Sequence, residues 1–122
     1  MCVKYVSGSV SFIPILSAVT PESAGSVQFG EPTTIQLKYR ELPGRNPTRQ
    51  EGPHAHQAIL HPTSGELLVP DLGTDQVCRF KKTDAGKWES VGGMDIQYEA
   101  GGGPRHVAFY RIYVQLFTSS LN

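Results

Sequence analysis

Turn signals only a few residues apart interrupt the apolar runs in the middle of the chain. Between residues 49 and 76 the sequence bends at 62–65 (PTSG) and again at 73–75 (GTD). The apolar runs at 58–60 and 67–69 between these bends are too short for an ordinary helix. Short apolar runs bounded by turns predict consecutive antiparallel strands.

The same alternation of short runs and turns continues in both directions. We expect strands at 77–80, 88–91, 96–99 and 104–109, and within 3–16 a strand end, a tight bend and a second strand. Residues 26–29 and 33–39 are expected to form one interrupted strand. Thirteen Gly and nine Pro in 122 residues indicate a turn-rich, all-β single domain. Strands spaced by about ten residues are typical of a sandwich, a barrel or a propeller blade.

Charge and cysteine content restrict the partners and the location. Eleven basic and eleven acidic side chains cancel, which argues against nucleic-acid binding and against an anionic membrane surface. The apolar run at 107–117 contains Arg111 and is far shorter than the ~20 residues of a membrane helix. Cys2 and Cys78 form no recognisable disulfide framework, so we expect two free thiols and a cytoplasmic location.

A short internal repeat favours the propeller. Residues 55–60 (AHQAIL) align with residues 104–109 (PRHVAF) at an offset of 49 residues, which is close to the span of a four-stranded blade. The alignment places His56 on Arg105 and Gln57 on His106. Matching positions of successive blades lie at similar depth along a propeller channel. His56 and Arg105 are therefore expected to face one common cavity.

Three sequence segments also resemble a known family. SGSVSFIPI, RQEGPHAHQAILHPTSGELLVPDLGTDQV and GGGPRHVAF closely resemble segments of the lactonase family of seven-bladed β-propellers. This family includes propeller-type 6-phosphogluconolactonase and fungal carboxymuconate cyclase-like enzymes. The similarity covers residues 3–16 and 49–109.

The resemblance implies an incomplete β-propeller made of antiparallel four-stranded blades. Residues 1–48 would be the end of one blade and a loop, 49–103 one complete blade, and 104–122 the first strand of the next blade with an atypical tail. The chain would then depend on the missing blades of the full-length propeller.

The resemblance also implies a site and a reaction. His56 and Arg105 match the family positions that line the central channel, and we expect them to be the catalytic pair, with His54 and His106 as substrate-binding neighbours. An imidazole can accept a proton from water near neutral pH, and a guanidinium can bind a carboxylate, a phosphate or a developing oxyanion. The expected substrate is a small anionic sugar lactone or carboxymuconolactone, which is hydrolysed or formed without a cofactor or a metal.

The sequence departs from the family after residue 109. The family continues with a His-Pro, a turn and a strand that supplies a channel carboxylate, whereas residues 110–117 read YRIYVQLF. For this reason we expect little or no activity from the chain alone. Two alternatives stay open: a non-catalytic propeller fragment, and a small β-domain that binds a metal through His54, His56 and His106. The cupin pattern fails because Glu66 comes too late, beyond a turn.

Three further residues are given structural roles. Asp71 and Asp75 flank Gly73 in a predicted hairpin and are expected to cap turns. Trp88 is expected to pack between blades. The glycines at 101–103 lack the lysine and helix of a phosphate loop.

Overall fold

All regular structure in the described part of the chain is β-strand. The computed structural model describes residues 1–17, 27–38, 44–110 and 113–118. The strands in chain order are β1 (Cys2–Lys4), β2 (Ser9–Phe12), β3 (Ile15–Ser17), β4 (Gln28–Phe29), β5 (Thr33–Gln36), β6 (Ile59–Leu60), β7 (Leu67–Asp71), β8 (Gln76–Lys82), β9 (Trp88–Ser90), β10 (Ile96–Gln97), β11 (Pro104–Tyr110) and β12 (Tyr113–Thr118). Every pair of these strands is antiparallel, which confirms the all-β prediction. Within these ranges there is no helix that could span a membrane.

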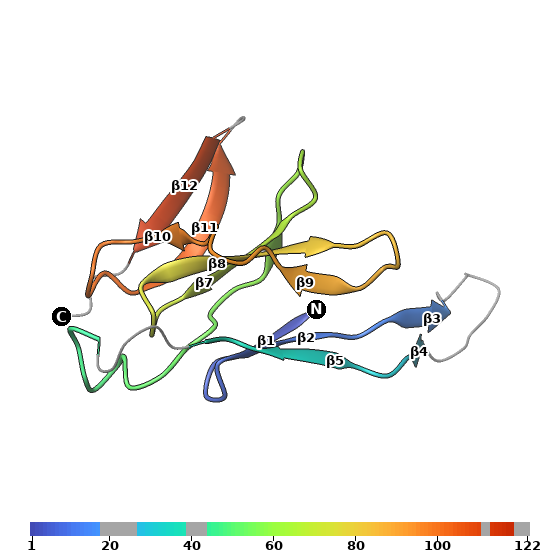
Figure 1. Cartoon of the computed structure of the whole chain (residues 1–122), viewed down its shortest axis with the longest axis horizontal. Coiled ribbons are helices and arrows are strands. Elements are labelled where there is room, and N and C mark those ends of the chain that lie inside the picture. The colour runs from blue at the N-terminus through green and yellow to red at the C-terminus, as the bar shows by residue number, and fades with distance from the viewer. Residues whose placement is uncertain (18–26, 39–43, 111–112, 119–122) are drawn as a thin grey trace.

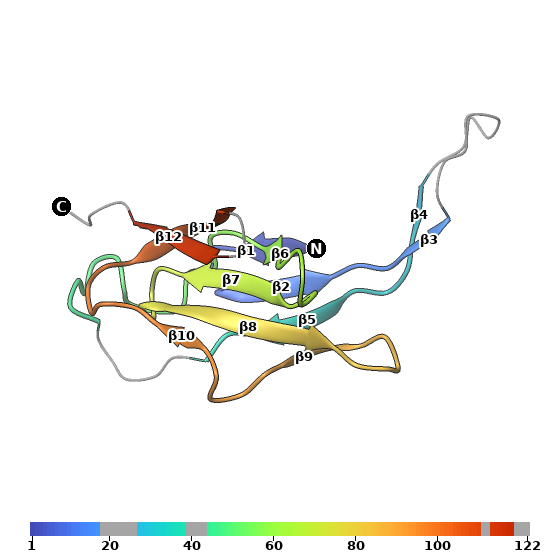
Figure 2. The same ribbon diagram turned by 90° about the horizontal axis from the view of Figure 1, so that it is seen from above.

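The described strands form three sheets that pack face to face, and a small two-stranded pair, β3–β4. An N-terminal sheet has the order β1-β2-β5, and a central sheet has the order β10-β8-β7-β6 with β9 also paired to β8. The β11–β12 hairpin flanks the other side of the central sheet (Figure 1). The β3–β4 pair extends away from the rest as an arm (Figure 2).

The central sheet is an up-and-down meander whose outer edge is interrupted. β7 pairs with β8 from Leu67 opposite Phe80 to Asp71 opposite Gln76. β9 and β10 then pair with the two ends of β8 on the same edge, one after the other. Between them Asp95 Oδ1 accepts the Arg79 N–H at 2.8 Å, which satisfies the backbone where the outer strand is broken.

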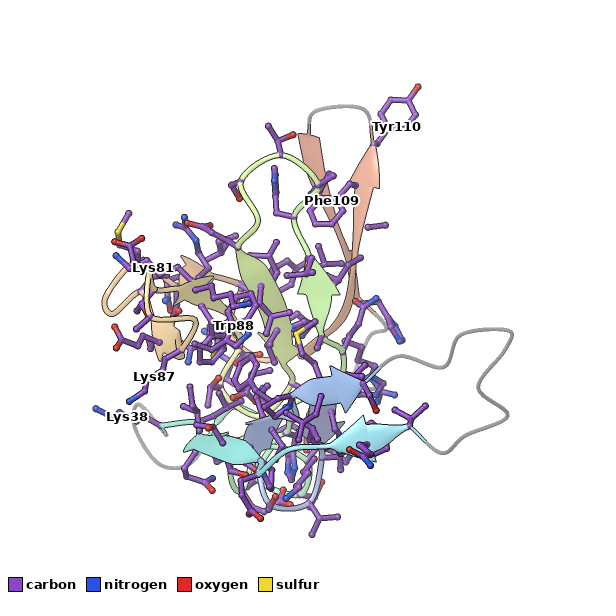
Figure 3. The ribbon with its side chains drawn as sticks, turned by 90° about the vertical axis from the view of Figure 1, so that its right-hand side faces the viewer. Lys38, Lys81, Lys87, Trp88, Phe109 and Tyr110 are labelled. Carbon is purple, nitrogen blue, oxygen red and sulfur yellow. The ribbon has the colours of Figure 1, made fainter. Side chains whose placement is uncertain are left out.

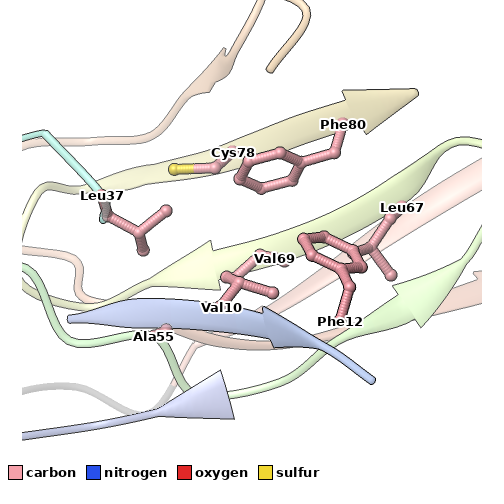
Figure 4. Close-up of a cluster of buried hydrophobic side chains, with 8 residues drawn as sticks. All are labelled: Val10, Phe12, Leu37, Ala55, Leu67, Val69, Cys78 and Phe80. Atoms are coloured by element: carbon pink, nitrogen blue, oxygen red, sulfur yellow. The ribbon is translucent and has the colours of Figure 1, made fainter. Parts of the chain in front are cut away.

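One face of the central sheet packs on the N-terminal sheet. Alternate residues of β7 and β8 point to this face, as the two-residue period of a strand requires. The buried side chains gathered here come from both sheets and from neighbouring loops (Figure 4): Val10, Phe12, Leu37, Ala55, Leu67, Val69, Cys78 and Phe80. Trp88 stacks on Phe12 with ring centroids 5.3 Å apart, so it packs between two sheets as expected.

The opposite face of the central sheet packs on β11. Leu68 and Val77 are buried there against Val107. The Val107 N–H donates to Gln57 Oε1 at 2.7 Å and so fixes β11 to the segment before β6. Phe109 meets His61 edge-on at 5.0 Å, and Figure 3 shows the neighbouring Tyr110 pointing away from the ribbon.

Most predicted strands are present, including the interrupted one. β4 and β5 pair with β3 and β2 in one continuous antiparallel register, so residues 28–29 and 33–36 are two parts of a single interrupted strand. The Gly30 N–H donates to Pro14 O at 2.8 Å within the interruption. Residues 26 and 39 lie outside the described residues. The atypical tail forms β12 and folds back on β11.

Candidate functional site

The segment that carries His54 and His56 runs antiparallel to the end of β7. Ala55 forms an isolated bridge with Asp71, and the His56 N–H donates to Pro70 O at 3.0 Å. The Leu72 N–H in turn donates to His54 O at 3.1 Å. These backbone bonds hold both histidines beside β7 before the short strand β6 begins.

Arg105 and His106 lie at the start of β11, where the strand is irregular. Pro104 is opposite Thr118 and His106 is opposite Phe117, so the pairing register shifts at Arg105. An extra residue in one strand bends it and re-aims its side chains. The irregularity explains how two adjacent residues can both approach His56.

His56, Arg105 and His106 form a cluster, which we call the histidine–arginine cluster. The rings of His56 and His106 meet edge-to-face with centroids 5.0 Å apart. Both His106 and Arg105 act electrostatically on His56. His56 and Arg105 are half-buried and His106 is exposed, so the cluster lies at the surface of the chain. His56 and Arg105 therefore lie within electrostatic reach of each other, and a common cavity for the two stays a prediction.

Burial and charge favour the neutral form of His56. Loss of solvent lowers the pKa of its imidazole below the ordinary 6.5, and the charges of His106 and Arg105 lower the pKa further. An imidazole that is neutral at pH 7 can accept a proton.

Two atoms of the cluster have unused hydrogen-bonding capacity. His56 Nδ1 and Arg105 Nε are buried, and neither has a hydrogen-bond partner within the described ranges. Buried polar atoms without partners are rare in folded proteins and point to a ligand, an ion or a water. One atom is a ring nitrogen and the other an N–H donor, so together they can bind a group that carries acceptor oxygens and a transferable proton.

His54 is placed differently from His56. Its ring is buried and stacks on Tyr5 with centroids 4.4 Å apart. Nδ1 lies 3.0 Å from Tyr5 O, and Nε2 lies 2.9 Å from Glu51 Oε1. Both ring nitrogens therefore have protein partners, and a substrate contact for His54 stays a prediction. His54 cannot offer a nitrogen to a metal without losing these contacts, and no group of three potential metal-ligating side chains occurs among the described residues.

A second set of polar residues, the anchor network of Gln50, His54, Asp71 and Asp75, holds the loops that carry the cluster. Asp71 Oδ1 accepts the N–H groups of His54 at 2.6 Å and Gly73 at 3.0 Å. Burial raises the pKa of this carboxyl, and hydrogen bonds from His54, Thr74 and Gly73 oppose that shift. Gln50 Nε2 donates to Leu72 O and to Asp75 Oδ1.

Tyr5 and Gln50 were not predicted from the sequence to belong to these two regions. Tyr5 lies in the β1–β2 turn, and its ring meets the ring of His56 edge-on with centroids 5.9 Å apart, although the two residues are 51 positions apart in the sequence. No local pattern marks such a long-range contact. A cavity of about 410 Å³ lies elsewhere, between β5 and the β8–β10 edge, and none of the four predicted site residues lines it.

Comparison with known proteins gives a consistent result. The family model described as "Lactonase, 7-bladed beta-propeller" matches residues 1–117. An Arthroderma benhamiae protein named "Probable 6-phosphogluconolactonase" is 45% identical over 67 residues, which are 55% of this chain and 16% of that protein. The Bacillus subtilis 6-phosphogluconolactonase is 37% identical over 108 residues, which are 88% of this chain and 27% of that protein.

A solved structure from Bacteroides fragilis matches with a TM-score of 0.71 and 26% identity. The match covers 95% of this chain and 32% of that one. The chain thus spans less than a third of the length of these relatives.

Proposed function

Since the chain belongs to the lactonase family of seven-bladed β-propellers, we propose that its histidine–arginine cluster is one wall of a lactone-hydrolysing site. The single observation that supports this most directly is the pair of buried, unpartnered atoms, His56 Nδ1 and Arg105 Nε, on residues that act on each other electrostatically. The proposed substrate is an anionic sugar lactone, with 6-phosphogluconolactone as the first compound to test, because two matching relatives carry that activity in their names.

In the proposed reaction His56 acts as the base. A water oxygen attacks the lactone carbonyl carbon and its proton passes to the neutral imidazole, whose lowered pKa keeps the ring unprotonated near pH 7. The carbonyl oxygen becomes an oxyanion, the ring C–O bond then breaks, and the departing ring oxygen takes up the proton from His56. The product is an open-chain hydroxy acid.

Arg105 is proposed to bind negative charge. Its Nε–H and the rest of its guanidinium can donate to the carbonyl oxygen as that atom becomes an oxyanion, or to the phosphate of the substrate. His106 is exposed beside His56 and is proposed to contact the substrate. His54 is proposed to support substrate binding indirectly, by holding its neighbours in place, since its own ring nitrogens meet Tyr5 and Glu51.

Lactone formation by a carboxymuconate cyclase-like reaction would be a different step, in which a substrate carboxylate oxygen adds to a carbon–carbon double bond and the neighbouring carbon takes up a proton. His56 would then donate that proton, and Arg105 would still bind the anion. We place hydrolysis first because of the names of the relatives, and we include a cytoplasmic location in the proposal.

The whole reaction is proposed for the complete propeller and not for this chain by itself. A single blade buries its sheet faces only against its neighbours, and the relatives are at least three times as long as the matched segment. Turnover by the isolated chain is expected to be little or none, whereas weak binding to one wall of the site can still be measured.

Binding of 6-phosphogluconate, the product anion, tests the proposal. Nuclear magnetic resonance of the ¹⁵N-labelled chain should show shifts at His56 and Arg105 that saturate with ligand. Arg105→Gln should abolish the shifts, while Lys38→Gln, a charge change on a different element, should leave them unchanged. Saturable shifts elsewhere, with none at the cluster, would remove the basis for this assignment.

A further inference from the structure

We propose that Asp75, at the β7–β8 turn, is a positioning residue that holds the loop before β11 and thereby keeps Arg105 beside His56. The inference rests on the proposed role of Arg105 and assigns a function to a residue that does not itself reach the cluster.

The carboxylate of Asp75 gathers backbone donors from the loop at 101–103. The Gly101 N–H donates to Oδ2 at 2.7 Å, and the Gly103 N–H donates to Oδ1 at 2.8 Å. The Tyr98 N–H also donates to the backbone oxygen of Asp75 at 2.8 Å. Three of the six peptide groups from 98 to 103 are therefore fixed to one residue, and Arg105 follows two residues later.

The loop itself is shaped for this contact. Gly101 and Gly103 have φ values of +83° and +54°, which glycine adopts without strain. Successive N–H groups in such a conformation form a concavity that binds an anion. Here the anion is the Asp75 carboxylate, so this glycine-rich loop already has its acceptor and is not free to bind a phosphate.

Asp75 also connects Arg105 to the segment that carries His56. Gln50 Nε2 donates to Asp75 Oδ1 at 2.7 Å, and Asp71, four residues earlier, accepts the His54 N–H at 2.6 Å. One turn of the central sheet thus holds both loops that deliver the proposed catalytic pair. A carboxylate is required because both of its oxygens accept, whereas an amide offers one acceptor and one donor group.

The titration of His56 in the Asp75→Asn variant tests the inference. Asp75 has a φ of +53°, and Asn tolerates this conformation as well as Asp does, so the turn is preserved. If Arg105 moves away, the loss of its nearby positive charge raises the pKa of His56 toward 6.5. Removal of the Asp75 charge by itself would lower the pKa of His56. The direction of the pKa shift therefore distinguishes a displaced Arg105 from a direct electrostatic effect of Asp75.

The expected result is an upward shift of the His56 titration midpoint, measured from ¹H–¹³C spectra. The affinity for 6-phosphogluconate should also fall by about 10-fold or more. In an Arg105→Gln background, Asp75→Asn should raise the His56 midpoint by less than in the wild type, because only the effects of burial and of His106 remain. Asp75→Gly, which also permits a positive φ, serves as the second variant if Asp75→Asn does not fold.

Glu66→Gln is the matched control for a general loss of stability. It weakens the Arg79–Glu66 ion pair of 2.7 Å at the far end of β7, roughly 13 Å from Pro70 by strand geometry, and should leave the His56 midpoint unchanged. A lower or unchanged His56 midpoint in folded Asp75→Asn and Asp75→Gly would overturn the inference. If the wild type binds no 6-phosphogluconate but the midpoint still rises, the proposed function fails and the positioning role stands.

Discussion

Two polar regions share the same loops, but they use their polar atoms in different ways. In the anchor network, the backbone N–H groups of His54, Gly73, Gly101 and Gly103 all donate to the carboxylates of Asp71 and Asp75. In the histidine–arginine cluster, His56 Nδ1 and Arg105 Nε are buried and have no partner within the described ranges. The first arrangement stabilises the fold. The second has unsatisfied capacity that a ligand or solvent can meet.

Substitution at the centre of the anchor network should have the largest effect on stability. A Cβ on Gly73 would lie 1.7 Å from the backbone oxygen of Gly52, so Gly73→Ala must separate the two loops. We expect a loss of about 3 kcal/mol or more, the upper part of the range for overpacking, measured by urea unfolding.

Gly52→Ala is the control for this clash, since a Cβ on Gly52 meets nothing within 4 Å. That variant should be neutral or slightly more stable than the wild type, because Ala restricts the unfolded chain. Equal losses for the two variants would show that the close approach of these loops does not exist in solution.

Removal of the Asp71 carboxylate should have the next largest effect. Asp71→Ala leaves the buried N–H groups of His54 and Gly73 without their acceptor, and we expect a loss of about 2 kcal/mol. Asp71→Asn keeps one acceptor oxygen and removes a carboxyl whose pKa is raised by burial. It should cost clearly less than Asp71→Ala in the same unfolding assay. The reverse order would mean that charge, and not acceptance of these N–H groups, is what Asp71 contributes.

His54 and His56 lie in one segment but belong to different polar regions, so substitution of each histidine compares the two regions directly. His54→Phe loses the ring contacts to Tyr5 O and Glu51 and should cost about 1 kcal/mol. His56→Phe replaces an unpartnered polar atom by an apolar ring and should be neutral to slightly stabilising, within about 1 kcal/mol of the wild type. Only His56→Phe should also abolish 6-phosphogluconate shifts at Arg105.

Unfolding midpoints and ligand titrations of the two variants provide the check. If His56→Phe were the more destabilised of the pair, His56 would belong to the structural network and not to a ligand site.

The strands were predictable because their causes are local. Turn residues at 62–65 and 73–75 delimit β7, and the strand period sends Leu67 and Val69 to one face and Leu68 to the other. Strand pairing depends on partners far apart in the sequence. The composition of the segments at 28–29 and 33–36 therefore did not indicate that they pair with β3 and β2.

The candidate site was predictable only in part, for the same reason. The repeat and the family resemblance indicated His56 and Arg105, and the structure brings them within electrostatic reach. Asp75 was expected to cap its own turn, yet its carboxylate holds donors 26 and 28 residues away. Tyr5 reaches His54 and His56 only because two sheets pack together, and no residue pattern around Tyr5 carries that information.

Acidification should change the free energy of unfolding by the smallest amount, and His56 and Asp71 should contribute to that change with opposite signs. The folded-state pKa of His56 lies below 6.5, since burial and the charges of His106 and Arg105 disfavour its protonation; the ring of Tyr5 faces it from the β1–β2 turn. Below pH 6.5 the unfolded chain therefore binds this proton more readily than the folded chain does. The stability that His56 contributes is present above pH 6.5 and is lost as the pH falls through the folded-state pKa. Asp71, whose pKa is raised, contributes the opposite trend at lower pH.

Free energies of unfolding between about pH 8 and pH 5.5 should fall more steeply for the wild type than for His56→Phe. Parallel curves would show that His56 is as solvated in the folded chain as in the unfolded one.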